Sequence, residues 1–142
     1  EPDGMELYID HEAGGTHIDM DDIGSVFRSI PNMNSGWPIF ADCARPETIS
    51  YLARQGWNIQ GAEKWKGSVE DGVTYLRGFR RIYIHPRCTQ TIHEFQRYSY
   101  KVDKMTQRVL PVLEEGNDHY IDAIRYALYE YIKRNVSIFD AL

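Results

Sequence analysis

The feature that most constrains the fold is a regular alternation of helical and extended patterns through the middle of the chain. Apolar residues recur at helical spacing in four segments, 23–30, 46–56, 67–79 and 88–100. Short apolar or alternating runs separate these segments at 38–42, 57–61 and 81–86. Strands that are separated by helices generally run parallel and are joined by right-handed crossovers. The alternation therefore predicts an α/β domain.

The two flanks of this region add further elements. Residues 6–15 open with alternating apolar positions and end at two glycines, which predicts a strand and a turn, and residues 16–20 are expected to continue the sheet. Residues 100–112 form two short alternating halves, which predicts a β-hairpin. A final helix is expected from about Asp118 to about Arg134. Earlier in the chain, Ser68 and Asp71 have the spacing of a capping box.

Composition places the chain among ordinary globular domains. Its 142 residues are 42% hydrophobic and 26% charged, which fits one domain with one core. No apolar run approaches the roughly 18 to 20 residues of a membrane span, so a soluble, cytosolic protein is expected. Cys43 and Cys88 are far apart and lack C-x-x-C spacing, so both are expected to be free thiols.

Charge is distributed unevenly along the chain, whose formal net charge is -5. Residues 1–22 contain eight acids and no Lys or Arg, whereas residues 77–108 contain eight bases against two acids. The negative total argues against a nucleic-acid binder, but the basic stretch is compatible with phosphate contacts. A solvated charged surface explains the same stretch equally well.

An acidic side chain stands at the end of one predicted strand. Asp42 follows the apolar run 39–41, and functional groups of open α/β sheets gather beyond the carboxyl ends of strands. A buried carboxylate there would need hydrogen bonds or a bound cation, which makes Asp42 a candidate metal ligand. An aspartate that accepts backbone N–H bonds in the turn is the simpler interpretation.

The last predicted helix carries a second group of candidates. Asp118, Asp122 and Arg125 share one face, and His119 lies three residues before Asp122. Two acids one turn apart repel each other unless a cation lies near. Alternatively, Asp118 stabilises the helix start, and Asp122 pairs with Arg125 at the surface.

Two lysines precede the third predicted helix. Lys64 and Lys66 flank Trp65, just before Ser68, where exposed helix amides are suited to receive a phosphate. A solvated loop is the competing interpretation, and the residue types alone do not separate the two.

Five segments of the chain together resemble the C-terminal nuclease domain of the large terminase subunit of tailed bacteriophages. They are ADCARPETISYL, GAEKWKGSVEDGVTYLRGF, IHPRCTQTIHEFQRYSYKVDKMT, VLP and NDHYIDAIRYAL. The resemblance runs from about Leu7 to Tyr129, with the segments in order and at compatible spacing. It implies a single RNase H-like nuclease domain over residues 1–142, with a mixed sheet flanked by helices and a β-hairpin before the C-terminal helix.

The resemblance also implies an activity and a site. Members of this family cut concatemeric double-stranded phage DNA during genome packaging, with acidic residues that hold two divalent cations. Asp42, in AD-x-ARPE, is similar to the second acid of the family, and Asp122, in H-x-IDAIRYA, is similar to the last. Asp118 and His119 lie close enough to assist. Carboxylate oxygens suit Mg2+ or Mn2+, and two such ions about 3.5 to 4 Å apart would support a two-metal-ion hydrolysis.

Further expectations from the resemblance concern DNA, partners and location. Five basic residues are expected to hold the duplex backbone without reading its sequence, namely Lys64, Lys66, Lys101, Lys104 and Arg108. The expected partners are double-stranded DNA, the terminase ATPase domain, the small terminase subunit and the portal protein. The expected location is the cytoplasm of an infected bacterial host, with no membrane involved.

The chain departs from the family pattern in two ways. The first metal-ligating aspartate of the family lies on a strand before the segment that matches residues 7–15, and the G-x-x-x-x-G-K-[ST] loop of the ATPase domain does not occur. We therefore expect an N-terminally incomplete domain that lacks its first strand and one ligand, with weak metal affinity and activity. A sheet without a central strand exposes an edge, which favours self-association.

Two other functions remain open on the sequence. One is a non-catalytic DNA-binding or packaging-docking module, in which the acids serve structure and residues 77–108 grip DNA or the portal. The other is a different RNase H-like enzyme, such as a junction resolvase or a transposase. Such an enzyme shares the acids but not the long KWKGSVEDG and YSYKVDK segments.

Overall fold

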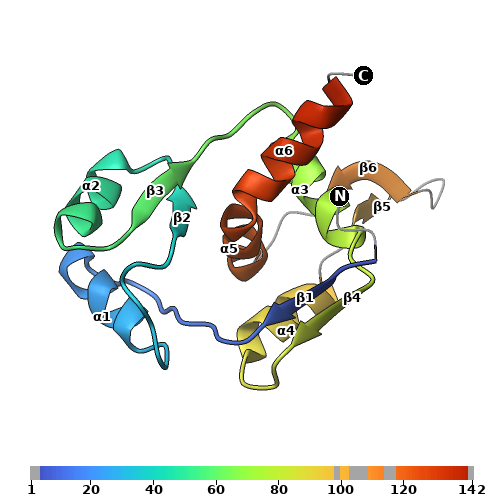
Figure 1. Ribbon diagram of the computed structural model, residues 1–142. Coiled ribbons are helices and arrows are strands. Elements are labelled where there is room, and N and C mark those ends of the chain that lie inside the picture. The colour runs from blue at the N-terminus through green and yellow to red at the C-terminus, as the bar shows by residue number, and fades with distance from the viewer. Residues whose placement is uncertain (1–3, 98–99, 103–108, 114–117, 141–142) are drawn as a thin grey trace.

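The computed structural model of the chain describes residues 4–97, 100–102, 109–113 and 118–140 (Figure 1). The first elements are β1 (Glu6–Ile9), a short 3-10 turn η1 (Met20–Asp22), α1 (Ile23–Arg28), β2 (Ile39–Asp42), α2 (Pro46–Arg54) and β3 (Ile59–Ala62). They are followed by α3 (Ser68–Arg77), β4 (Arg81–Ile84), α4 (Thr89–Arg97), β5 (Tyr100–Val102), β6 (Val109–Leu113), α5 (His119–Ala127) and α6 (Tyr129–Asp140). The predicted alternation of helices and strands is therefore present. None of the described helices has the length and apolar character needed to cross a bilayer.

The strands form three separate pairs within the described residues. β1 runs parallel to β4, with Leu7 opposite Ile82, and β2 runs parallel to β3, with Asp42 opposite Ala62. β5 and β6 pair in antiparallel fashion, so the predicted hairpin is confirmed. Parallel pairs with crossover helices and an antiparallel hairpin make up the mixed α/β architecture that the sequence predicts.

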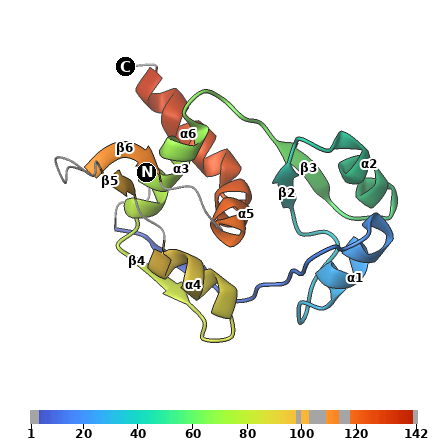
Figure 2. The same cartoon turned by 180° about the vertical axis from the view of Figure 1, so that it is seen from behind.

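Helix α5 lies between the two parallel pairs, as the front and back views agree (Figures 1 and 2). It contacts β2 as well as α3 and α4, and α2 packs on β3. The apolar core collects around these contacts, where Leu52 of α2, Ile121 of α5 and Ile132 of α6 are almost fully buried. Each such side chain contributes roughly 1.5–3 kcal/mol relative to an exposed one. Burial of Ile121 therefore fixes which face of α5 turns toward the strand ends.

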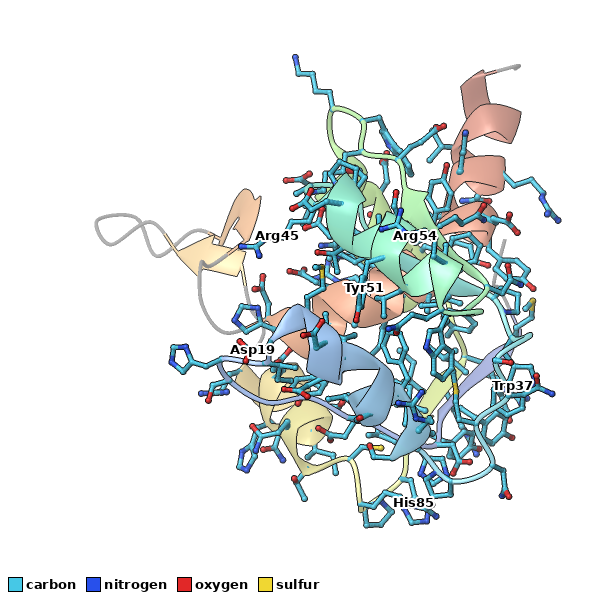
Figure 3. The ribbon with its side chains drawn as sticks, turned by 90° about the vertical axis from the view of Figure 1, so that its left-hand side faces the viewer. Asp19, Trp37, Arg45, Tyr51, Arg54 and His85 are labelled. Atoms are coloured by element: carbon cyan, nitrogen blue, oxygen red, sulfur yellow. The ribbon has the colours of Figure 1, made fainter. Side chains whose placement is uncertain are left out.

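Helix α2 is also tied to the segment before α1. The Tyr51 hydroxyl donates a hydrogen bond of 2.9 Å to the Asp21 carboxylate, and Figure 3 shows Tyr51 pointing from α2 toward α1. The Phe27 ring meets the Trp57 ring edge to face, with centroids 5.1 Å apart. These contacts connect η1 and α1 with α2 and with the segment that leads into β3.

The structure differs from two predictions of element boundaries. Residues 16–20 do not continue the sheet: 16–19 form no strand, and Met20 begins η1. The expected single C-terminal helix is interrupted at Leu128, whose φ and ψ of -94° and 9° separate α5 from α6. This interruption allows α5 to contact β2 while α6 packs on α3.

The predicted capping box at the start of α3 was also wrong. Gly67, in a left-handed conformation with φ of 85°, takes the N-cap position, so Ser68 already lies inside the helix. The Asp71 carboxylate instead accepts a hydrogen bond of 2.6 Å from the Trp65 indole N–H. A long-range partner thus replaces the local one, and the bond holds the segment that follows β3 against α3.

Candidate acidic site at the strand ends

A pocket of about 320 Å³ opens at the carboxyl ends of β2 and β3. Its walls come from these strand ends, the segment that follows β3, the start of α3, and parts of α5 and α6. The charged residues in its lining are Asp42, Glu63, Lys64, Asp118, Asp122 and Arg125. Four acids and two bases therefore meet at one edge of a parallel pair, where open α/β domains place their functional groups.

Asp42 reaches the pocket because it is the last residue of β2. Its carboxylate accepts a hydrogen bond of 3.0 Å from the Ala44 amide and lies 2.8 Å from the Lys64 ammonium. The Lys64 hydrogen bond holds the pKa of Asp42 below its usual range, against an opposing effect of partial burial. The carboxylate in turn raises the pKa of Lys64. Asp42 thus accepts a turn N–H, as the simpler interpretation expects, and also faces a cationic partner.

The parallel register places Lys64 beside Asp42. Asp42 lies opposite Ala62, the last residue of β3, and Lys64 follows Ala62 by two residues. Both side chains keep about half of their surface in water, with 47% exposed for Asp42 and 48% for Lys64. Water and salt screen a pair this exposed, so its contribution to stability is small. The pair therefore places two opposite charges in the pocket but adds little to the stability of the fold.

Asp118 and Asp122 come from the start of α5. Asp118 occupies the N-cap position, yet its side chain makes no capping hydrogen bond among the described residues. The Asp122 carboxylate accepts a hydrogen bond of 2.5 Å from the Arg125 guanidinium. The pairing of Asp122 with Arg125 is therefore confirmed, but Arg125 is 7% exposed and belongs to the interior rather than the surface.

A glycine on the neighbouring helix makes room for Arg125. A Cβ atom added to Gly72 of α3 would lie 2.6 Å from Cδ of Arg125, closer than real side chains approach. The missing side chain thus lets the Arg125 stem lie against α3. Within the described part of the chain, Nε of Arg125 has no hydrogen-bond partner, which is costly for a buried guanidinium. Residue spacing did not indicate this burial, because it depends on how α3 and α5 pack.

Three aromatic residues, Trp65, Tyr126 and Tyr129, complete the pocket. Burial raises the pKa of the Tyr126 hydroxyl, so the group stays neutral and able to donate a hydrogen bond. The Trp65 ring lies beside the Tyr129 ring, with centroids 6.5 Å apart. None of these aromatic residues was predicted to belong to the site. The one signal for Tyr126 is its place four residues after Asp122, which puts both on one face of α5.

The structure brings some of the predicted site residues together and leaves others apart. Those that line the pocket are Asp42, Lys64, Asp118 and Asp122. Those that are exposed and take no part in its lining are Lys66 and His119. Lys104 and Arg108 lie outside the described residues, as does the side chain of Lys101, whose backbone belongs to β5.

The donor set fits a hard divalent cation in part. Carboxylate oxygens are the ligands that Mg2+ and Mn2+ prefer, and two distant segments of the chain supply them to one pocket. However, over the described ranges no three His, Cys, Asp or Glu side chains stand close enough together to hold a metal ion. A cation in this pocket would compete with Lys64 for Asp42 and with Arg125 for Asp122. The described residues thus form a partial site in which Asp42 and Asp122 already have basic partners.

Parallel strand pairs with crossover helices, an antiparallel hairpin and carboxylates gathered at the strand ends define an α/β domain with an acidic site at one sheet edge. Comparison with known proteins narrows this class. The family model described as Terminase RNAseH like domain matches residues 35–130. The chain belongs to this family of terminase RNase H-like domains.

Three known proteins illustrate the relationship. The PBSX phage terminase large subunit of Bacillus subtilis (strain 168) is 32% identical over 96 residues, which are 66% of the chain and 21% of that protein. The large terminase subunit of Bacillus phage SPP1 is 38% identical over 99 residues, which are 68% of the chain and 23% of that protein. The chain matches the crystal structure of the g2p (large terminase) nuclease domain from bacteriophage SPP1 with bound Mn at a TM-score of 0.74 and 31% identity, over 87% of the chain and 70% of that structure. The matched part spans about a fifth of each large subunit.

Proposed function

We propose that this chain is a metal-dependent endonuclease domain that cleaves concatemeric double-stranded phage DNA during genome packaging. The observation that carries the proposal is the meeting of Asp42 and Asp122, eighty positions apart in the sequence, in one pocket at the strand ends. Kinship with a terminase nuclease domain that was crystallised with bound Mn supports a divalent cation there.

In this proposal Asp42 and Asp122 hold the cations, and Asp118 assists from the N-cap of α5. A bound pair of Mg2+ or Mn2+ ions supplies an activated water and charge stabilisation for in-line attack on a phosphodiester. A cation held by Asp42 would compete with Lys64 for the carboxylate, and the Lys64 ammonium would then be free to contact a phosphate at the same pocket. His119, exposed one residue after Asp118, is the weakest candidate ligand.

The proposed DNA contacts extend outward from the pocket. Lys64 lies in the lining, and Lys66 is exposed two residues further along the chain. Lys101, Lys104 and Arg108 extend the same role into the region of the β5 and β6 hairpin. As part of a large terminase subunit in an infected bacterial cell, the domain would work beside an ATPase domain, a small subunit and a portal protein.

The proposal is tested by plasmid nicking in Mn2+ with Asp42→Asn and Asp122→Asn, which remove a charged ligand and keep the side-chain size. We expect either substitution to reduce nicking to background, while duplex binding measured by fluorescence anisotropy persists. Glu47→Gln, at an exposed position in the first turn of α2, is the matched control and should cut like the wild type. Cutting that survives in both aspartate variants would remove the nuclease assignment.

A specific observation favours a second function. Asp42 and Asp122 each pair with a basic side chain, and no three suitable ligands stand together in the ranges that the structure describes. These pairings suit a non-catalytic DNA-binding or packaging-docking module, in which the acids serve structure. Duplex binding by the wild-type chain without any Mn2+-dependent nicking is the result that this alternative predicts.

A further inference from the structure

The start of α5 lacks a local cap. Asp118, at the N-cap position, makes no capping hydrogen bond to the described residues. The first amides of a helix have no acceptor within the helix, and they are costly when buried and unpaired. Ile121, in the first turn, is 1% exposed, so its surroundings offer little access to water.

Glu94 of α4 supplies the missing acceptors. Its Oε1 atom accepts hydrogen bonds from the amides of Tyr120, at 2.8 Å, and Ile121, at 2.9 Å, and its Oε2 atom accepts one of 3.1 Å from Tyr120. Glu94 is 5% exposed. Hydrogen bonds to a charged acceptor are the stronger kind, and the positive end of the helix dipole strengthens them further. A buried acid of one helix thus caps another helix that begins about 25 residues later.

This cap has a consequence for the acidic pocket. Because Glu94 serves the helix amides, the Asp118 carboxylate is not used for capping and lines the pocket instead. Two consecutive amides converge on one carboxylate, so the start of α5 is fixed relative to α4. The Asp122 amide bonds to the Asp118 carbonyl at 2.8 Å. A displacement of the helix start would therefore move both acids together.

We propose that Glu94 is a positioning residue for the acidic pocket, which sets where Asp118 and Asp122 stand relative to Asp42 by capping α5. The inference rests on the proposed function for the identity of the ligand, a divalent cation. Glu94 does not line the pocket, so it acts through α5. Groups that orient metal ligands from outside typically change metal affinity by about 10- to 100-fold when they are removed.

Glu12 offers a matched control for Glu94. Its Oε1 atom accepts hydrogen bonds from the amides of Gln90, at 3.0 Å, and Thr91, at 3.2 Å, at the start of α4. This is the same capping chemistry, on a helix that contributes no residue to the lining of the pocket. Glu12→Gln therefore weakens a carboxylate cap while leaving the cap of α5 in place.

The test compares the Mn2+ affinity of the wild-type chain, Glu94→Gln and Glu12→Gln. Free Mn2+ is measured by electron paramagnetic resonance, under conditions in which circular dichroism shows that all three chains are folded. We expect about tenfold or more weakening for Glu94→Gln and less than about twofold for Glu12→Gln. In proton–nitrogen correlation spectra, the amides of Tyr120 and Ile121 should shift upfield in Glu94→Gln alone, since they lose a charged acceptor.

The outcomes separate this inference from the proposed function. Equal Mn2+ affinity of the wild type and Glu94→Gln overturns the positioning role of Glu94 alone. No Mn2+ binding by the wild type overturns both the positioning role and the proposed metal-dependent function. If Glu94→Gln does not fold, Glu94→Asp decides, because it keeps the charge but is one methylene shorter. Weakened binding by folded Glu94→Asp supports the inference, and unchanged binding overturns it. Loss of folding in both variants, while Glu12→Gln folds, assigns Glu94 a purely structural role and also overturns it.

Discussion

The Lys64 ammonium lies 2.8 Å from the Asp42 carboxylate, in the pocket at the ends of β2 and β3. This hydrogen bond is the largest influence on the Asp42 pKa and lowers it below the value in the unfolded chain. The associated stabilisation is present above the unfolded pKa and is lost as the pH falls through the folded pKa. Asp42 therefore stays ionised further into the acid range than a free aspartate.

Removal of the Lys64 charge should reverse this effect. We expect Lys64→Met to raise the pKa of Asp42 toward its ordinary value, although the Ala44 amide, which also lowers it, keeps the return incomplete. Carbon-13 titration of the Asp42 carboxyl group measures the change. Lys66→Met, two residues further along and exposed, is the control that should leave the titration unchanged. Coincident titration curves for the two variants would show that the Lys64 pair does not persist in solution.

Gly72 should not tolerate a side chain. In Gly72→Ala the new Cβ would meet Cδ of Arg125 at 2.6 Å, and overpacking of this kind costs about 1–3 kcal/mol. Alanine regains about 1 kcal/mol over glycine within a helix, so the net loss should be about 0–2 kcal/mol. Urea unfolding measures it. Thr74→Ala, exposed on the same helix, should lose no stability. A Gly72→Ala chain about 1 kcal/mol more stable than the wild type, which is the full gain from helix propensity, would contradict the contact.

The two thiols should differ in reactivity. Cys43 is exposed, whereas Cys88 is fully buried and burial raises the pKa of its thiol, which suppresses the reactive thiolate. Ellman's reagent should therefore titrate one thiol in the native chain and two after denaturation. Cys43→Ala should abolish the native reaction. A native reaction of two thiols would mean that the segment around Cys88 opens readily.

Self-association through open strand edges is a further expectation. Among the described residues, β1 pairs with β4 and β2 with β3, so each strand keeps one edge without a strand partner. An apolar groove of about 590 Å³, lined in part by Ile39 and Phe40, runs beside β2. Unpaired edges are templates for association. Light scattering should show an average mass that rises with protein concentration, and a constant monomer mass would contradict the expectation.

A substitution at Tyr8 tests whether the edge of β1 is responsible. The carbonyls of Met5 and Ile9 accept hydrogen bonds from the amides of Arg80 and His85, which flank β4. Alternate residues of a strand direct their backbone groups to opposite edges, so the backbone of Tyr8 faces the open edge. Tyr8→Pro removes an edge N–H without breaking the ladder to β4. We expect it to stay monomeric at concentrations where the wild type and Tyr8→Phe associate. Equal association of all three would exclude this edge.

Local patterns predicted much of the fold and part of the site. The alternation of helices and strands predicted the parallel pairs, because each crossover helix is amphipathic and its apolar residues recur at helical spacing in the sequence. Asp42 was placed at a strand end for the same reason. The break at Leu128 was missed, since Ala127, Leu128 and Tyr129 carry no helix-breaking signal and packing of α6 on α3 decides it.

The missed features of the site all depend on tertiary contacts. The spacing of Ser68 and Asp71 predicted a capping box, but Trp65 takes the Asp71 carboxylate instead. Glu94 looks like an ordinary helix acid, and the amides that it serves, starting at Tyr120, lie 26 residues away. No local pattern connects partners at such separations, because only the packing of α4 on α5 brings them together.

The register of β2 against β3 sets where Lys64 stands relative to Asp42, because Lys64 follows Ala62, the strand partner of Asp42, by only two residues. One extra or one missing residue between Ala62 and Lys64 would change where the Lys64 side chain stands and separate its ammonium from the Asp42 carboxylate. Insertions and deletions between Ala62 and Lys64 should therefore abolish this ion pair. Any redesign of this domain has to keep the number of residues between Ala62 and Lys64, whatever residue types it changes elsewhere.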